Sequence, residues 1–155
     1  MKVIIRDLRV EDAEISWKWR NDSEVWKNTV KTWDNEITKE IEEAWIKDVI
    51  SRKNEKRFAI CVEDNEKYIG NIHLNNITQY EAECHIVIGD KVYWNKGVGI
   101  RAKNLIDEYA RDVMCLKRVY VRVKDINKAS LALLAKDNMT LVKEEDGFIY
   151  LVREL

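Results

Sequence analysis

The chain has 155 residues, with 27 Lys and Arg against 28 Asp and Glu, so its formal net charge is −1 and we expect a single domain over residues 1–155. Without a basic excess or a long apolar stretch, it is expected to have no nucleic-acid partner, no membrane partner and no signal peptide. Its three cysteines are widely spaced in apolar segments, which argues against a disulfide framework or a metal site and fits a reducing cytoplasm.

The first half of the chain alternates between strand and helix periods. Residues 3–10 predict a strand, and a helix follows from the acidic pair at 11–12 as far as 21–22. Asp34 is predicted to cap a second helix. An apolar stripe at helical spacing supports that helix, namely Ile37, Ile41, Ala44, Trp45 and Val49. Two strands then form a predicted hairpin, over 58–62 and 68–74, with a turn at 64–66.

The second half begins with a strand over 82–88 that has two different sides. Ala82, Cys84, Ile86 and Ile88 face one way, while Glu83, His85 and Val87 face the other. A long amphipathic helix is predicted over 98–113 and a strand over 118–123. The chain is then predicted to close with a helix capped by Asn127, running to residue 136, and a hairpin of 141–143 with 148–152 around Asp146-Gly147.

Two glycines one residue apart precede the long helix, in the segment Trp94-Asn95-Lys96-Gly97-Val98-Gly99-Ile100-Arg101. Glycine lets the backbone turn tightly and approach a ligand, and the free N–H groups of a first helical turn attract anions, with Lys96 and Arg101 adding charge. A P-loop would need a following Lys-Ser/Thr, and a dinucleotide site would need a third glycine. Coenzyme A is therefore the leading phosphate ligand, and a plain tight entry to the helix is the alternative.

Several segments together give the chain a family resemblance. Ala82-Glu83 followed by 93–99, with Trp19-Arg20-Asn21 and with Asn127 and Ser130 in one helical turn, resembles the GNAT superfamily of acetyl-coenzyme A dependent N-acetyltransferases. The tryptophan in the loop is similar to that of the ribosomal-protein N-terminal acetyltransferase subgroup and its small-molecule relatives. The resemblance implies an α/β (α+β) fold: a mixed, mostly antiparallel sheet of about seven strands, flanked by about four helices and splayed between strands 4 and 5.

The same resemblance implies where acetyl-coenzyme A, the co-substrate, would lie. Its pantetheine arm would pair with the backbone of Ile86, Val87 and Ile88 in the gap between the fourth and fifth strands. Its pyrophosphate would sit on the N–H groups of the glycine loop, and Asn127 would contact the pantetheine arm. The implied cofactor contacts outside the strand are thus Asn95, Lys96, Gly97, Val98, Gly99, Ile100, Arg101, Asn127 and Ser130.

An acceptor amine is mostly protonated at neutral pH, so a base must remove a proton before the amine attacks the thioester. Glu83 is the first candidate, because it stands on the ionisable side of its strand and at a position where related enzymes have a glutamate. His85 is the second, two residues on and facing the same way. The structural alternatives are a solvated strand residue for Glu83 and a hydrogen-bonded, half-buried one for His85.

The chain departs from the family pattern in the helix after Asn127. Many relatives have a tyrosine there as the acid that protonates the leaving thiolate, and the corresponding residue is Leu134. The thiol of coenzyme A is a tolerable leaving group, so we expect positioning to supply most of the rate.

The resemblance implies transfer of an acetyl group to a primary amine, with an amino sugar or another small amine as the leading acceptor. A protein N-terminus as acceptor and a non-catalytic coenzyme A-binding module are the alternatives. Relatives that pair through strand edges imply that a homodimer can form, and no metal is expected. Candidate acceptor contacts, chosen as polar or aromatic residues near the cleft, are Asn21, Trp26, Asn71 and His73.

Overall fold

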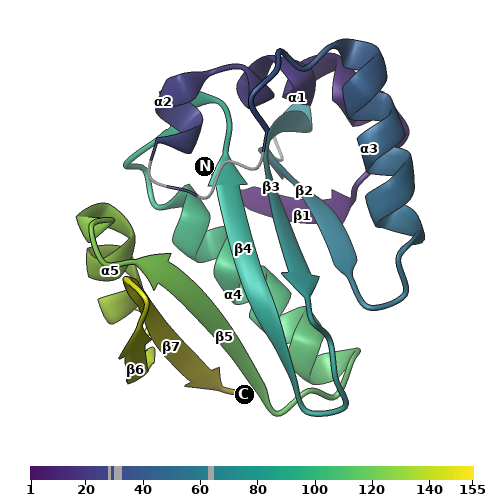
Figure 1. Cartoon of the computed structure of the whole chain (residues 1–155). Coiled ribbons are helices and arrows are strands. Elements are labelled where there is room, and N and C mark those ends of the chain that lie inside the picture. Colours follow the sequence, from purple (N-terminus) through teal and green to yellow (C-terminus); the bar gives the residue numbers. More distant parts are fainter. Residues whose placement is uncertain (28, 30–32, 63–64) are drawn as a thin grey trace.

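The computed structural model describes residues 1–27, 29, 33–62 and 65–155. They form a mixed sheet of seven strands in the order β1-β2-β3-β4-β5-β7-β6, with helices on both faces (Figure 1). Among the described strands β4 and β5 are the parallel pair, and the other neighbours are antiparallel. The strands are β1 (Val3–Asp7), β2 (Lys56–Val62), β3 (Lys67–Asn75), β4 (Glu81–Ile88), β5 (Arg118–Lys124), β6 (Thr140–Glu145) and β7 (Phe148–Glu154).

Five α-helices accompany the sheet in the described part of the chain, one more than the sequence predicts. The additional helix is the single turn α2, which Asp22 caps by accepting a hydrogen bond from the Glu24 N–H at 3.0 Å. The helices are α1 (Ala13–Arg20), α2 (Ser23–Trp26), α3 (Lys39–Ser51), α4 (Val98–Asp112) and α5 (Lys128–Ala135).

Alternation along β2 divides the interior into two cores on opposite faces of the sheet. Phe58 and Ile60 belong to a core shared with α4 and α5, and Figure 1 shows α4 behind the strands. Ala59 and Cys61 belong to a smaller core shared with α1 and α3. The predicted amphipathic helix is confirmed by α4, whose buried apolar residues are Val98, Ala102, Ile106 and Ala110.

Both predicted hairpins are confirmed by the register. β2 pairs with β3, although Asp64 of the predicted turn lies outside the described residues. β6 pairs with β7 around Asp146 and Gly147, which both have left-handed backbones, with φ of 52° and 79°. Asp-Gly favours such a two-residue turn because glycine and aspartate tolerate this conformation.

The predicted second helix is wrong in its start, and its predicted buried face is confirmed at Val49 but wrong at Ile41. Thr38, not Asp34, caps α3, and its hydroxyl accepts the Ile41 N–H at 3.2 Å. Ile37 therefore lies before the helix, and Ile41 is 48% exposed. The face turned inward instead contains Glu42, which is 1% exposed and accepts a hydrogen bond from Ser16 of α1 at 2.9 Å. Docking against α1 decides the orientation of this helix.

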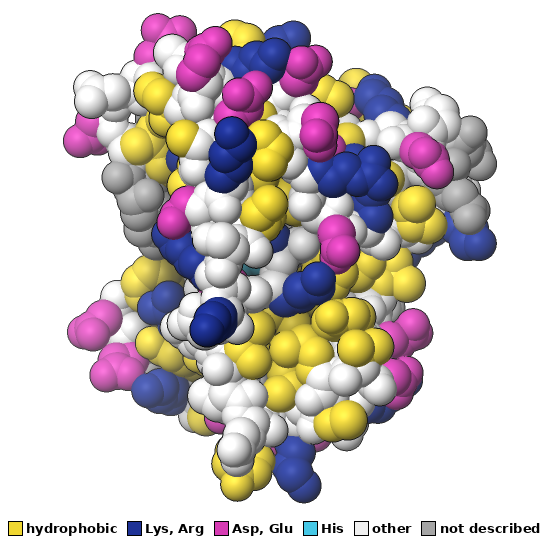
Figure 2. Space-filling view, turned by 90° about the vertical axis from the view of Figure 1, so that its right-hand side faces the viewer, with side chains coloured by type: hydrophobic (Ala, Val, Ile, Leu, Met, Phe, Trp, Pro, Cys, Tyr) yellow, Lys and Arg dark blue, Asp and Glu magenta, His cyan; other side chains and the backbone are white. Residues whose placement is uncertain are grey.

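Charged side chains of both signs are interspersed over the face of the molecule that Figure 2 shows. This agrees with the near balance of 27 basic and 28 acidic residues. No helix in the described part of the chain is long and apolar enough to cross a bilayer.

Candidate functional site

The parallel strands β4 and β5 separate along their length. They pair through Glu81 to Glu83 with Arg118 to Tyr120, and no later position of the two described strands is paired. β3 still covers the other edge of β4 as far as Ile88. Figure 1 shows the two strands diverging toward their C-terminal ends. The β4 edge that carries Ile86, Val87 and Ile88 is thus open to an extended ligand arm, which can add to it like a strand.

The glycine loop follows this open edge. Asn95 and Gly97 have left-handed backbones, with φ of 60° and 75°, on either side of Lys96. Such alternation aims successive N–H groups into a concave nest that suits an anion. α4 then begins at Val98, and its first ladder bond runs from the Arg101 N–H to the Gly97 carbonyl at 3.2 Å, so the preceding N–H groups are left for a ligand.

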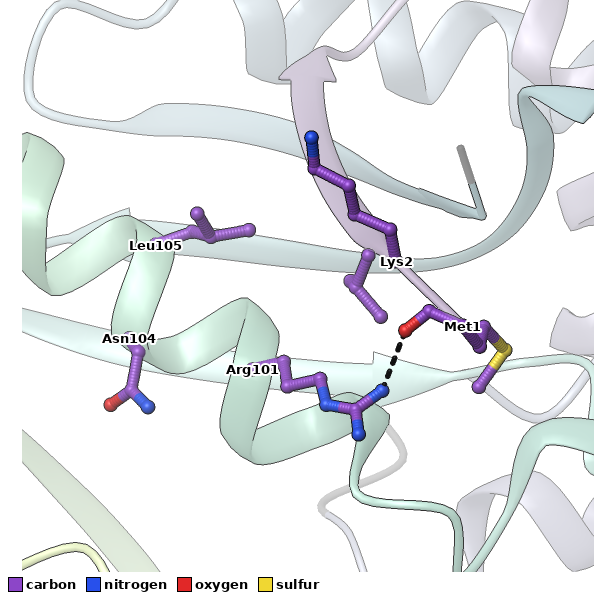
Figure 3. A pocket seen from close by; sticks show the side chains of 6 residues that line it. Met1, Lys2, Arg101, Asn104 and Leu105 are labelled. Atoms are coloured by element: carbon purple, nitrogen blue, oxygen red, sulfur yellow. Dashed lines mark hydrogen bonds between the residues drawn. The ribbon is translucent and has the colours of Figure 1, made fainter. Parts of the chain in front are cut away.

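Arg101 lies at a different place from the one predicted for its charge. Its guanidinium donates to the Met1 carbonyl at 2.8 Å, beside a pocket of about 460 Å³ between β1 and α4 (Figure 3). Lys96 lies above the Tyr93 ring, 5.9 Å from its centroid. The pocket is lined by Met1, Lys2, Val3, Arg101, Asn104 and Leu105, and it contains none of the residues on the open edge of β4.

Glu83 and His85 form a contacting pair where β4 and β5 begin to separate. The Glu83 carboxylate contacts His85 Nε2 and accepts hydrogen bonds from Arg122 Nε at 2.8 Å and Nη2 at 3.3 Å. Burial alone would raise the pKa of Glu83, but the hydrogen bonds from His85 and Arg122 outweigh it and lower that pKa. The Glu83 side chain is 2% exposed and that of His85 is 35% exposed, so the imidazole is the accessible member of the pair.

His73 stacks on His85 from the neighbouring strand. The two are register partners in β3 and β4, and their rings lie 4.9 Å apart at 12°. Burial lowers the pKa of His73 well below its usual value, and the nearby charges of Arg57 and His85 lower it further. His73 is therefore held neutral beside the pair of Glu83 and His85.

The other candidate acceptor contacts are committed to neighbouring groups. The Asn21 amide donates to the Ile37 carbonyl and accepts the Ile37 N–H, both at 2.8 Å, which ties α1 to the segment before α3. The Trp26 indole donates to the Trp19 carbonyl at 2.8 Å. Asn71 accepts the Tyr68 hydroxyl at 2.5 Å. Asn21 and Trp26 thus hold the helical segments that cover the sheet, and Asn71 is engaged within β3, whereas His73 stacks on His85.

The helix α5 carries the predicted contacts of the pantetheine arm. Asn127 caps it by accepting the Ser130 N–H at 3.2 Å, so both residues lie in its first turn. Leu134 is 7% exposed and belongs to the core shared with α4. Its side chain is therefore part of the packing between helices and sheet.

Sequence reasoning did not assign a role to Arg20, Arg57 and Arg122, of which Arg57 is the register partner of His73. Arg122 holds Glu83, and Arg20 and Arg57 lie against Trp45 at 4.6 and 5.3 Å from its ring centroid. The available signal was the period-2 spacing that places Arg57 and Arg122 on the same face of the sheet as the histidines. Within the described residues no group of three or more His, Cys, Asp or Glu could hold a metal ion.

Comparison with known proteins agrees with this geometry. The acetyltransferase (GNAT) domain family matches residues 2–140. A search of curated protein sequences finds no significant match. Solved structures do match, and a domain from Methanocaldococcus jannaschii DSM 2661 has a TM-score of 0.83 at 21% identity, covering 99% of each chain.

Two further solved structures hold ligands of the coenzyme A type. Campylobacter jejuni N-acetyltransferase PseH in complex with acetyl coenzyme A has a TM-score of 0.74 at 21% identity and covers 99% of each chain. Vibrio cholerae spermidine N-acetyltransferase in complex with CoA and spermine has a TM-score of 0.83 at 16% identity, covering 98% of this chain and 95% of that one. At such identities the structural likeness shows the fold, while the match over residues 2–140 shows the family.

Proposed function

The chain belongs to the GNAT acetyltransferase family, and we propose that it transfers the acetyl group of acetyl-coenzyme A to the primary amine of a small molecule. As a member of this family it is an acyltransferase. The observation that best supports this proposal is the open edge of β4. The pair of Glu83 and His85, called the reactive pair below, lies at one end of this edge, and the nest of Asn95 to Gly97 lies at the other.

The nest and the edge suit the two parts of the co-substrate. N–H groups around Gly97 can bind a pyrophosphate with the positive end of the α4 dipole behind them. The backbone of Ile86, Val87 and Ile88 can pair with the amides of a pantetheine arm. Such a ligand would bring its thioester toward Glu83 and His85, where β4 and β5 first separate.

Within the reactive pair we assign proton acceptance to His85 and positioning to Glu83. The contact of His85 Nε2 with the Glu83 carboxylate fixes the tautomer, which leaves Nδ1 as the basic nitrogen. Glu83 is the base that its strand position predicts, but both its oxygens are engaged and its pKa is lowered, which weakens it as a base. The neutral amine then forms the C–N bond and the C–S bond breaks. The nitrogen loses a second proton, the leaving thiolate takes up one proton, and the proton accepted by His85 passes to solvent.

A small amine is favoured over a protein N-terminus as acceptor. The V. cholerae neighbour is named for spermidine, which is a small amine. No observation singles out the ribosomal-protein subgroup. A homodimer stays a prediction, for which light scattering is the measurement.

Single substitutions at the reactive pair test this assignment. We expect His85→Gln to lower kcat by about 100- to 10,000-fold, the usual contribution of a general base, without changing acetyl-coenzyme A affinity. The loss should shrink as the pH is raised toward the pKa of the acceptor amine, because solvent then removes the proton. Glu83→Gln should lower kcat less. Thiol release with a panel of amines, and calorimetric titration of acetyl-coenzyme A, are the measurements.

Glu81→Gln is the matched control, since Glu81 lies on the same strand and its carboxylate pairs with the exposed Arg118 at 4.0 Å, away from His85. It should retain the wild-type kcat. If Glu83→Gln greatly lowers kcat and His85→Gln leaves kcat unchanged, Glu83 is the direct base. Failure of the wild-type protein to bind acetyl-coenzyme A would overturn the proposed function itself.

A further inference from the structure

Two arginines lie on one tryptophan beside the histidine pair. The guanidinium carbon of Arg20 in α1 lies 4.6 Å from the Trp45 ring centroid, and that of Arg57 in β2 lies 5.3 Å from it. Arg57 is the register partner of His73, which stacks on His85. Arg57 thus lies opposite His73 in the sheet and its charge acts on that imidazole, while Trp45 links Arg57 to Arg20.

The positive charge of these arginines is only partly compensated. Arg20 Nε lies 3.7 Å from Glu42 Oε2, and neither buried atom has a hydrogen-bond partner among the described residues. Burial lowers the pKa of Arg20 and raises that of Glu42, since their contact does not offset desolvation. Arg57 shares Glu55 with Arg52, and its own buried Nε also lacks a partner in the described part of the chain.

Aromatic rings frame the first of these cations. Arg20 lies 4.0 Å from the Trp33 ring centroid and 5.9 Å from that of Trp26, in addition to Trp45. The rings restrict the guanidinium and exclude water around it, which strengthens its interaction with an anion. The Arg20 side chain is 13% exposed and that of Arg57 is 11% exposed, so solvent reaches part of each side chain.

We infer that Arg20 and Arg57, with Trp45 between them, bind an anionic group of the amine acceptor, a phosphate or a carboxylate. The inference rests on the proposed function, because it names the class of acceptor for the same site. A planar guanidinium donates two parallel hydrogen bonds to either anion, and the Nε–H groups of Arg20 and Arg57 lack a partner in the described part of the chain. The acceptor is therefore an acidic amine, such as an amino sugar that bears a phosphate or carboxylate.

A polyamine fits this site poorly. A polycation needs uncommitted carboxylates, and those nearest in sequence to the site are already paired. Asp22 and Glu24 both contact Lys91, at 2.8 and 3.4 Å. Glu83 is held by Arg122. A polycation would also meet the repulsion of Arg20 and Arg57, as like charges in a partly desolvated site repel strongly.

Anion binding can be tested without knowing the acceptor. The whole protein is saturated with coenzyme A, so that its own phosphate site is filled, and intrinsic fluorescence of the six tryptophans is followed. We expect a saturable change with inorganic pyrophosphate or UDP if the group is a phosphate, and with succinate if it is a carboxylate. Uridine and spermidine should give none.

Variants connect the signal to the two arginines. Arg20→Gln and Arg57→Gln should each weaken anion affinity by about 10- to 100-fold, the usual effect of losing a charge-assisted hydrogen bond. Arg20→Lys, which keeps the charge but loses the planar donor pair, should fall between. Lys18→Gln removes an exposed cation from the same helix and should bind like the wild type. Unchanged coenzyme A affinity and thermal midpoint would show that each variant is folded.

Turnover gives a second readout. Glucosamine 6-phosphate and muramic acid should have a kcat/KM at least about 10-fold above that of glucosamine, or should inhibit acetylation of a working amine where glucosamine does not. The inference is overturned if no anion gives a saturable signal, or if Arg20→Gln and Arg57→Gln bind anions as tightly as Lys18→Gln does. Acetyl-coenzyme A binding and thiol release with any amine are measured independently of the anion signal. The proposed function is therefore tested separately from this inference.

Discussion

Gly89 shows how one missing side chain sets the position of a whole helix. A Cβ atom at this residue would lie 1.9 Å from Cδ2 of Trp19, a separation that real Cβ atoms essentially never show. The ring centroids of Trp19 and Tyr68 also lie 4.8 Å apart, and the backbone carbonyl of Trp19 accepts the Trp26 indole N–H. Glycine at the end of β4 therefore allows α1 to rest directly on the sheet at this point.

Gly89→Ala should lower the free energy of unfolding by about 1–3 kcal/mol, because the methyl group would displace the packed indole. Urea unfolding followed by far-UV circular dichroism is the measurement. Gly99→Ala is the control, because a Cβ at Gly99 would meet only Leu133 Cδ2, at an ordinary 3.7 Å, and alanine favours the helix. Equal unfolding midpoints for the two variants would contradict the packing role of Gly89.

At the scale of elements, α4 carries a buried ion-pair network as well as its apolar face. Lys103 is 1% exposed, and its ammonium lies 2.7 Å from Asp107 and 3.3 Å from Asp137. Arg153 of β7 contacts the same two carboxylates at 3.0 and 3.1 Å. Desolvation raises the pKa of Asp107, which shows how much the carboxylate depends on these cations. The network joins α4, the end of α5 and β7.

Lys103→Ala should destabilise the protein by about 3–5 kcal/mol, since it leaves buried carboxylates with less compensation. The matched control on the same helix is Arg111→Ala, because Arg111 and its partner Asp112 are both exposed and such pairs contribute little. Chemical denaturation of both variants is the measurement. A Lys103→Ala midpoint as high as that of Arg111→Ala would show that Arg153 alone compensates the carboxylates.

At the scale of the whole molecule, buried His73 couples stability to pH. His73 has a pKa well below 6.5 in the folded state, and near that ordinary value when the chain is unfolded. The unfolded state then binds more protons between these two values, so the free energy of unfolding falls as the pH is lowered below about 6.5. Glu42 and Asp107, with raised pKa values, act in the opposite direction and reduce the net slope.

His73→Gln should remove this contribution, which is at most about 1.4 kcal/mol per pH unit. The measurement is urea unfolding of wild type and variant at pH 7, 6 and 5, and the difference between the two proteins isolates the histidine from the carboxylates. We expect the wild type to lose more stability than the variant over this range. Parallel pH dependences would mean that His73 can be protonated within the folded sheet.

The sequence by itself determined the elements and the local parts of the site. A period of two places Glu83 and His85 on one side of a strand whatever that strand pairs with, and glycine chemistry specifies the turn before α4 wherever the helix packs. The amphipathic pattern of α4 and the Asp-Gly hairpin are local in the same way. For these features the physical cause lies within a few residues of the chain.

Only the tertiary structure decided which side chains meet. Arg122 reaches Glu83 across 39 positions because β4 and β5 align over three residue pairs before they separate. Arg20 and Arg57 meet on Trp45 because α1 and α3 dock on one face of the sheet, and that docking also buries Glu42 where the helical pattern predicted Ile41. Periodicity fixes the direction of a side chain within its element, whereas register and docking depend on residues far apart in the chain.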